Sequence, residues 1–150
     1  MDARQAILHI AREIMADIRD FNDICFIGMN KNGKYMAEQV ALHILRMENI
    51  SIEVYTKEEC ALAQKSKAIL MLDTLCSGRS TCFALSKLLK EGGFSEIMLA
   101  VLVDCYNRRS VPLVSDFFGY RVYLAKNATV CMNLSESEEI QKTEEELGRQ

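Results

Sequence analysis

The chain has 150 residues, of which 49% are hydrophobic and 26% charged, with one proline and a formal net charge of −3. This composition is globular, and the length is most simply that of one domain with a sizeable core. Residues 135–150 hold six glutamates against one lysine and one arginine, which leaves the other 134 residues close to +1. That balance does not favour a nucleic-acid partner, and we expect none. We interpret 1–134 as the folded domain and 135–150 as an acidic C-terminal tail, either a solvated helix or a frayed end.

The cysteine and histidine content argues against a zinc site. Six cysteines include no C-x-x-C pair, and the only histidines are His9 and His43. The sequence also lacks a signal peptide and an apolar run of 18 residues. We therefore expect a cytoplasmic protein with reduced thiols and no membrane association.

In chain order, the apolar pattern predicts helices alternating with strands. Apolar residues at helical spacing predict a helix over 3–20, and a wholly apolar strand follows at 24–29. Gly33 is expected to open a second helix, and the alternating residues 51–56 predict a strand. An apolar strand at 68–73, a helix at 79–91 that ends at Gly92-Gly93, and a long apolar strand at 96–104 come next. Segments 120–125 and 129–134 are further strand candidates.

Strands that are apolar on both faces and alternate with helices indicate an α/β fold, with a mainly parallel sheet covered on both sides. In such sheets ligands bind beyond the carboxyl ends of the strands. The loops at those ends span residues 28–33, 73–80 and 104–109. We therefore expect the functional site where these three loops meet.

The first loop, GMNKNGKY (28–35), fits a phosphate-binding P-loop at every position but the last, where Tyr35 replaces a small hydroxyl residue. That hydroxyl would bind the metal, and a bulky phenol would crowd the phosphate. A P-loop nucleotidase is therefore one hypothesis. An ordinary polar turn that uses glycines for tight geometry is another.

The second loop has the chemistry of a phosphate cradle. Ser77, Gly78, Arg79 and Ser80 turn the chain from a strand end into a helix N-terminus, where unpaired N–H groups favour an anion. Asp73 precedes the turn and is placed to accept hydrogen bonds from sugar hydroxyls. Phosphate together with a diol indicates a ribose 5-phosphate group. The alternative is that Asp73 and the serines only cap the helix.

LMLDTLCSGRST (70–81) resembles the ribosyl-phosphate-binding motif of the type I phosphoribosyltransferases. Among the branches of that family, the chain is most similar to the pyrimidine operon regulator that is also a uracil phosphoribosyltransferase. The similarity runs from about residue 5 to 134 and includes DFFG (116–119), which looks like the family's segment beside the base. It implies the type I phosphoribosyltransferase fold, a homodimer, and transfer of ribose 5-phosphate from phosphoribosyl pyrophosphate to a base, with Mg²⁺ bound through that substrate.

The resemblance also implies roles for individual residues. Asp73 would be the catalytic residue and would hold the ribose together with Thr74, and Phe117 would lie against the base, unless it is ordinary core packing. The 5-phosphate would be bound by Cys76, Ser77, Gly78, Arg79 and Ser80, and pyrophosphate by Asn30, Lys31 and Asn32.

Cys76 departs from the family pattern, because several branches have an acid near the base at this position. Three other departures argue for weak catalysis. Leu72 stands where the motif has its first acid, and Asn32 stands where the operon-regulator branch has a second cation beside Lys31. Residues 57–67 form a short connection where the family has a long loop that closes over the reacting centre and excludes water. We expect either a phosphoribosyltransferase with low turnover or a non-catalytic relative that senses a nucleotide.

Overall fold

The computed structural model describes residues 1–144, with Glu144 described by its backbone alone. Its centre is a five-stranded sheet of order β2-β1-β3-β4-β5, in which every neighbouring pair is parallel. The strands are β1 (Ile24–Gly28), β2 (Val54–Thr56), β3 (Lys67–Leu75), β4 (Glu96–Cys105) and β5 (Phe117–Val122). The expected α/β fold with a parallel sheet is confirmed.

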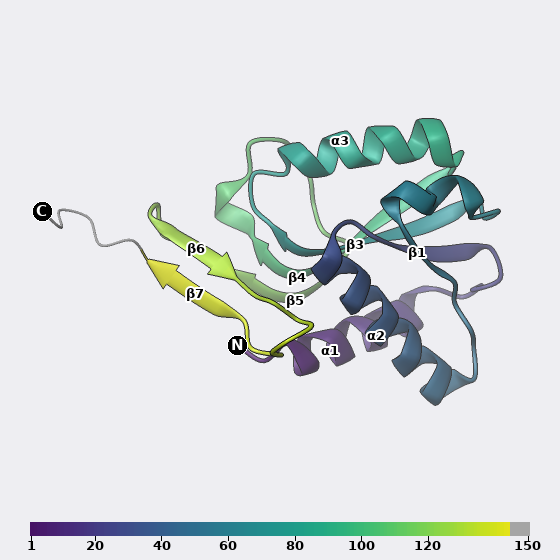
Figure 1. Cartoon of the computed structure of the whole chain (residues 1–150), viewed down its shortest axis with the longest axis horizontal. Coiled ribbons are helices and arrows are strands. Elements are labelled where there is room, and N and C mark those ends of the chain that lie inside the picture. The colour runs from purple at the N-terminus through teal and green to yellow at the C-terminus, as the bar shows by residue number, and fades with distance from the viewer. Residues whose placement is uncertain (145–150) are drawn as a thin grey trace, which may run out of the picture.

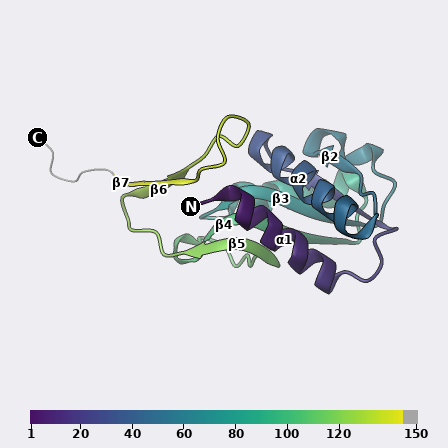
Figure 2. The same ribbon diagram turned by 90° about the horizontal axis from the view of Figure 1, so that it is seen from below.

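Helices cover both faces of the sheet (Figures 1 and 2). Helices α1 (Ala3–Asp17) and α2 (Lys31–Glu48) pack on one face. Helix α3 (Arg79–Lys87), which continues as the π-helical turn η2 (Leu88–Gly92), packs on the other. Two short 3-10 helices, η1 (Lys57–Leu62) and η3 (Tyr106–Arg108), lie in connections. No helix in the described part of the chain is long and apolar enough to cross a membrane.

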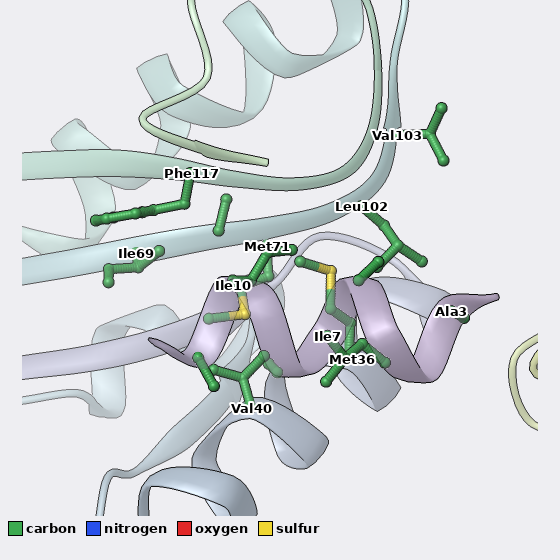
Figure 3. Packing of buried hydrophobic residues seen from close by; sticks show 14 of the residues in the cluster. Ala3, Ile7, Ile10, Met36, Val40, Ile69, Met71, Leu102, Val103 and Phe117 are labelled. Carbon is green, nitrogen blue, oxygen red and sulfur yellow. The ribbon is translucent and has the colours of Figure 1, made fainter. Parts of the chain in front are cut away.

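Two hydrophobic clusters form the core, one on each face of the sheet. On β3, Ile69 and Met71 belong to the α1/α2 cluster, whereas Leu70 and Leu72 belong to the α3 cluster. This alternation follows from the period of two along a strand. Figure 3 shows part of the α1/α2 cluster, which takes residues from both helices and from β3, β4 and β5. The apolar runs in the sequence are thus strands buried on both faces.

The strand order defines where a ligand can bind. The chain passes from β1 outward to β2 and then returns to β3 on the other side of β1, so the order reverses between β1 and β3. At such a switch point the loops after the two strands diverge and leave a crevice at their carboxyl ends. The loops after Gly28 and Leu75 are two of the three that the sequence singled out.

Several element boundaries differ from the sequence expectation. Helix α1 ends at Asp17 rather than at residue 20, β2 covers only Val54–Thr56, and β5 begins at Phe117 rather than at residue 120. Helix α2 begins at Lys31, two residues before Gly33, because Asn30 is its N-cap and accepts a 2.7 Å hydrogen bond from the Gly33 N–H.

The C-terminal segment is more ordered than expected as far as residue 144. Strand β6 (Ala128–Cys131) pairs antiparallel with β7 (Gln141–Glu144), and Ile140 is buried in the α1/α2 cluster. The N–H of Ala3 also donates to the Glu138 carbonyl at 2.7 Å. Residues 135–144 are therefore neither a solvated helix nor a frayed end, and 145–150 lie outside the described residues. A domain boundary after residue 134 stays a prediction.

Candidate functional site

The Asp73 carboxylate joins the end of β3 to the N-terminal turn of α2. It accepts hydrogen bonds from the Asn32 side chain at 2.8 Å, the Asn30 side chain at 3.3 Å and the Thr74 N–H at 2.8 Å. The residue that the resemblance assigns to the ribose therefore touches two of the three assigned to pyrophosphate. The switch-point geometry brings these candidates together, although about 40 residues separate them in the sequence.

The turn after β3 leaves its backbone N–H groups available. Gly78 has a φ of +83°, a conformation that L side chains rarely adopt, and helix α3 begins at the next residue. No hydrogen bond among the described residues engages the N–H groups of Ser77, Gly78 or Ser80, and the Arg79 N–H has only a 3.4 Å contact to the Ser77 hydroxyl. Gly78 is buried and Ser77 half-buried, whereas Arg79 and Ser80 are exposed. These groups can receive an anion at a helix N-terminus.

Cys76 is half-buried at the start of this turn, and its thiol is perturbed. Leu75 of β3 pairs with Asp104 of β4, and Cys76 and Cys105 are the residues that come directly after this pair. A hydrogen bond from the Cys105 thiol lowers the pKa of Cys76 to about 7, against the effect of burial and with help from the positive charges of Arg108 and Arg109. The same contact, together with burial, raises the pKa of Cys105. A thiol that ionises near neutrality is more reactive than an ordinary core cysteine.

A third segment, which sequence reasoning missed, closes one side of the site. The Asn32 side chain donates to the Met132 carbonyl at 3.1 Å and accepts from the Leu134 N–H at 3.0 Å. The connection after β6 is thereby fixed to the N-terminal turn of α2, beside Asp73. No local sequence signal marks a contact of this kind, because the partners are about 100 residues apart.

The loop after β1 is not a P-loop. Because α2 already begins at Lys31, Lys34 lies within the helix, and no extended loop between Gly28 and Lys34 remains to wrap a phosphate with backbone N–H groups. Packing explains why position 33 is a glycine, since a Cβ there would lie 2.4 Å from the Met71 carbonyl oxygen. The exposed Lys31 and Lys34, together with Lys57, line an open hollow of about 340 Å³ at the ends of β1 and β2.

The connection between β2 and β3 is a folded segment. It holds η1, begins with a capping box of Thr56 and Glu59, and buries Cys60 and Ala63 against the sheet. Nothing between these strands resembles a long loop that could close over Asp73. The edge of the site near Lys57 is therefore open to solvent.

Two further candidates lie in the core. Leu72, at the position of the motif's first acid, is 1% exposed and faces the α3 cluster, away from Asp73. Phe117 is 3% exposed at the start of β5 and packs in the α1/α2 cluster (Figure 3). This burial agrees with the core-packing alternative, and contact with a base would require the ring to be uncovered.

Among the described residues, no group of three or more histidine, cysteine, aspartate or glutamate side chains could hold a metal ion. Near the turn, the Asp104 carboxylate is 1% exposed and paired with Arg109. Asp73 is thus the carboxylate beside the turn that can meet a ligand or a ligand-bound cation, whereas the exposed Glu58 lines the hollow near Lys57.

Solved structures of phosphoribosyltransferases superpose on this fold. A hypoxanthine-guanine phosphoribosyltransferase from Leishmania tarentolae in complex with GMP superposes with a TM-score of 0.76 at 18% identity, covering 97% of this chain and 95% of that one. One from Bacillus anthracis superposes with a TM-score of 0.59 at 17% identity, covering 81% and 82%. These likenesses show the type I phosphoribosyltransferase fold.

Sequence comparison gives the family. The bifunctional protein PyrR of Brevibacillus brevis is 30% identical over 89% of this chain and 86% of its own length, and that of Herpetosiphon aurantiacus is 30% identical over 90% and 86%. No family model matches the chain. On these similarities the chain belongs to the PyrR family within the phosphoribosyltransferases, which confirms the resemblance seen in the sequence.

Proposed function

We propose that the crevice between β1 and β3 binds a ribose 5-phosphate group, either as phosphoribosyl pyrophosphate or as a nucleoside monophosphate. The phosphate occupies the turn of Ser77, Gly78, Arg79 and Ser80, and the ribose hydroxyls meet Asp73 and Thr74. The observation that carries this proposal is the turn itself. The N–H groups of Ser77, Gly78 and Ser80 at the start of α3 have no partner among the described residues, and Asp73 lies near the end of the preceding strand β3.

The ancestral reaction is displacement of pyrophosphate by a nitrogen of a base, which we propose to be a pyrimidine. Asn30, Lys31 and Asn32 hold the pyrophosphate, with Lys31 supplying positive charge. In this reaction the side chains position the reactants and neutralise charge, and the N–H groups of the turn fix the phosphate. Mg²⁺, bound through phosphoribosyl pyrophosphate, neutralises the departing pyrophosphate when present.

We propose that turnover is weak and that nucleotide sensing without catalysis is the second candidate function. Leu72 is buried and apolar, so Asp73 stands alone, and the β2–β3 connection does not cover the reacting centre. Both losses remove stabilisation that matters most in the transition state, so they lower kcat more than affinity. A protein with these features can still bind its ligand.

The remaining properties are part of the proposal: the homodimer follows from the family, and the absence of a nucleic-acid ligand from the near-neutral charge of residues 1–134. We propose a cytoplasmic homodimer without a nucleic-acid ligand. Exposed apolar side chains on α3 and η2, namely Phe83 at 82% and Leu89 at 51% exposure, are available to a second copy. A place for Phe117 beside the base stays a prediction.

Incubation with phosphoribosyl pyrophosphate, Mg²⁺ and a panel of bases, with pyrophosphate release as the signal, separates the two functions. We expect release far below the enzyme median of roughly 10 per second, and calorimetric binding of uridine monophosphate by the same preparation. Release near that median would contradict the proposed loss of activity. Absence of both release and binding would refute the proposed function.

A further inference from the structure

The Arg109 side chain lies directly beneath the phosphate turn and contacts four groups. Its Nη1 donates to the carbonyl oxygens of Leu75 at 3.0 Å and Cys76 at 2.8 Å, and its Nε donates to the Leu113 carbonyl at 2.9 Å. Its Nη2 donates to the Asp104 carboxylate at 2.5 Å. The side chain is 14% exposed, so it is not an arginine that only reaches into solvent.

These contacts account for the direction of the peptide groups in the turn. The Leu75 and Cys76 carbonyls point to Arg109, the Ser77 carbonyl accepts from the Ser110 N–H at 2.9 Å, and the Gly78 carbonyl accepts from the Cys82 N–H at 2.9 Å. Four successive carbonyls therefore accept hydrogen bonds from donors within the protein. In the turn, the N–H groups of Ser77, Gly78 and Ser80 have no hydrogen-bond partner among the described residues, as an anion site requires.

The position of the guanidinium is itself fixed by a buried acid. Asp104 is 1% exposed and accepts from Arg109 on one oxygen and from the Ser115 hydroxyl on the other at 2.7 Å. Arg121 also approaches the second oxygen at 3.7 Å, but it stacks on the Phe118 ring and is half-exposed. The planar guanidinium of Arg109 can donate to the carboxylate and to two carbonyls at once. A lysine ammonium cannot reproduce that geometry.

We propose that Arg109, held by Asp104, is a positioning residue that orients the 75–78 peptide groups so that the turn can bind a phosphate. It acts through the backbone and need not touch the ligand. The ligand part of this inference rests on the proposed function, whereas the effect of Arg109 on the turn can be measured without any ligand.

The test compares Arg109→Lys with Arg121→Lys. Both changes keep a positive charge near Asp104, but only the first removes contacts to the turn. In the ligand-free protein, exchange of the hydrogen-bonded amides within residues 75–82, such as Cys82, whose N–H donates to the Gly78 carbonyl, should quicken about tenfold in Arg109→Lys and stay within twofold in Arg121→Lys. Affinity for uridine monophosphate should fall about tenfold in the first variant alone, with exchange in β1 and α1 unchanged in both.

The outcomes separate the two proposals. If Arg109→Lys lowers the melting temperature but leaves exchange of residues 75–82 and nucleotide affinity unchanged, Arg109 is only structural and the inference is wrong. If exchange responds while the wild-type protein binds no nucleotide, the inference about the turn holds and the proposed function fails. If Arg109→Lys does not fold, Asp104→Asn is used in its place. Asparagine keeps the shape of the aspartate side chain but removes the negative charge that holds the Arg109 guanidinium. Unchanged exchange in that variant would equally overturn the inference.

Discussion

Replacing Gly78 by alanine should cost both stability and ligand affinity, and replacing Gly93 should cost stability alone. Both glycines have positive φ, +83° and +68°. An alanine in that conformation costs roughly 1–2 kcal/mol, which for a chain of this size lowers the melting temperature by about 2–8 °C. The two variants should therefore be destabilised to a similar degree by their backbones.

The surroundings of the two glycines differ. A Cβ at Gly78 would lie 2.9 Å from a Val111 methyl and 3.2 Å from a Leu113 methyl, whereas a Cβ at Gly93 meets nothing within 4 Å. The turn must therefore shift in Gly78→Ala, and the N–H groups of the phosphate cradle shift with it. We expect affinity for uridine monophosphate to fall at least about tenfold in Gly78→Ala and to be unchanged in Gly93→Ala.

Urea unfolding and isothermal calorimetry on the two variants measure both effects. The comparison removes stability as a confounding factor, since Gly93 lies at the far end of the helix that the cradle begins. Wild-type affinity in Gly78→Ala, with stability lowered as in Gly93→Ala, would refute the placement of the phosphate at this turn.

Three further changes test other parts of the site. Leu72→Asp should lower the free energy of unfolding by about 3 kcal/mol or more, because the Leu72 side chain is 1% exposed. Leu72→Met should lower it by less than about 1.5 kcal/mol. Equal urea midpoints for the two variants would contradict the burial of this side chain. The rate at which iodoacetamide alkylates Cys76 should rise from pH 6 to pH 8, with a midpoint near the pKa of about 7, because the thiolate is the nucleophile. Cys105→Ala should move this midpoint up toward about 8.5. A midpoint that does not move in Cys105→Ala would disprove the contact between the two thiols. Lys31→Ala should weaken pyrophosphate binding about tenfold. Lys34→Ala should weaken it less, because Lys34 pairs with Glu38 at 4.0 Å. The reverse order of the two affinities in calorimetry would count against the assignment of Lys31.

The sheet and the turn between β3 and α3 could be predicted because their signals are local, whereas phosphate binding at that turn stays a prediction. A strand buried on both faces is apolar at every position, as in β3 and β4, and a turn between strand and helix needs a residue such as Gly78. The same locality explains the Asp73 prediction, since an acid directly after an apolar strand is conspicuous in the sequence.

What could not be predicted depends on contacts between distant segments. Asn32 was assigned to a pyrophosphate loop, but nothing local showed that it would also bind the backbone after β6. Arg109 received no role from the sequence beyond its place in the loop 104–109, and only the fold brings it under the turn 33 residues earlier. Ile140 was obscured by the acidic residues around it, although its burial ties the segment after residue 134 to the core.

The central claim is that the turn of Ser77 to Ser80 binds the phosphate of a ribose 5-phosphate group. Titration of the isotopically labelled protein with ribose 5-phosphate and, separately, with ribose, followed by amide NMR, tests it most directly. We predict saturable shifts of the Ser77, Gly78 and Ser80 amides with ribose 5-phosphate and none with ribose. Shifts confined to other residues, or the same shifts with both sugars, would contradict the claim.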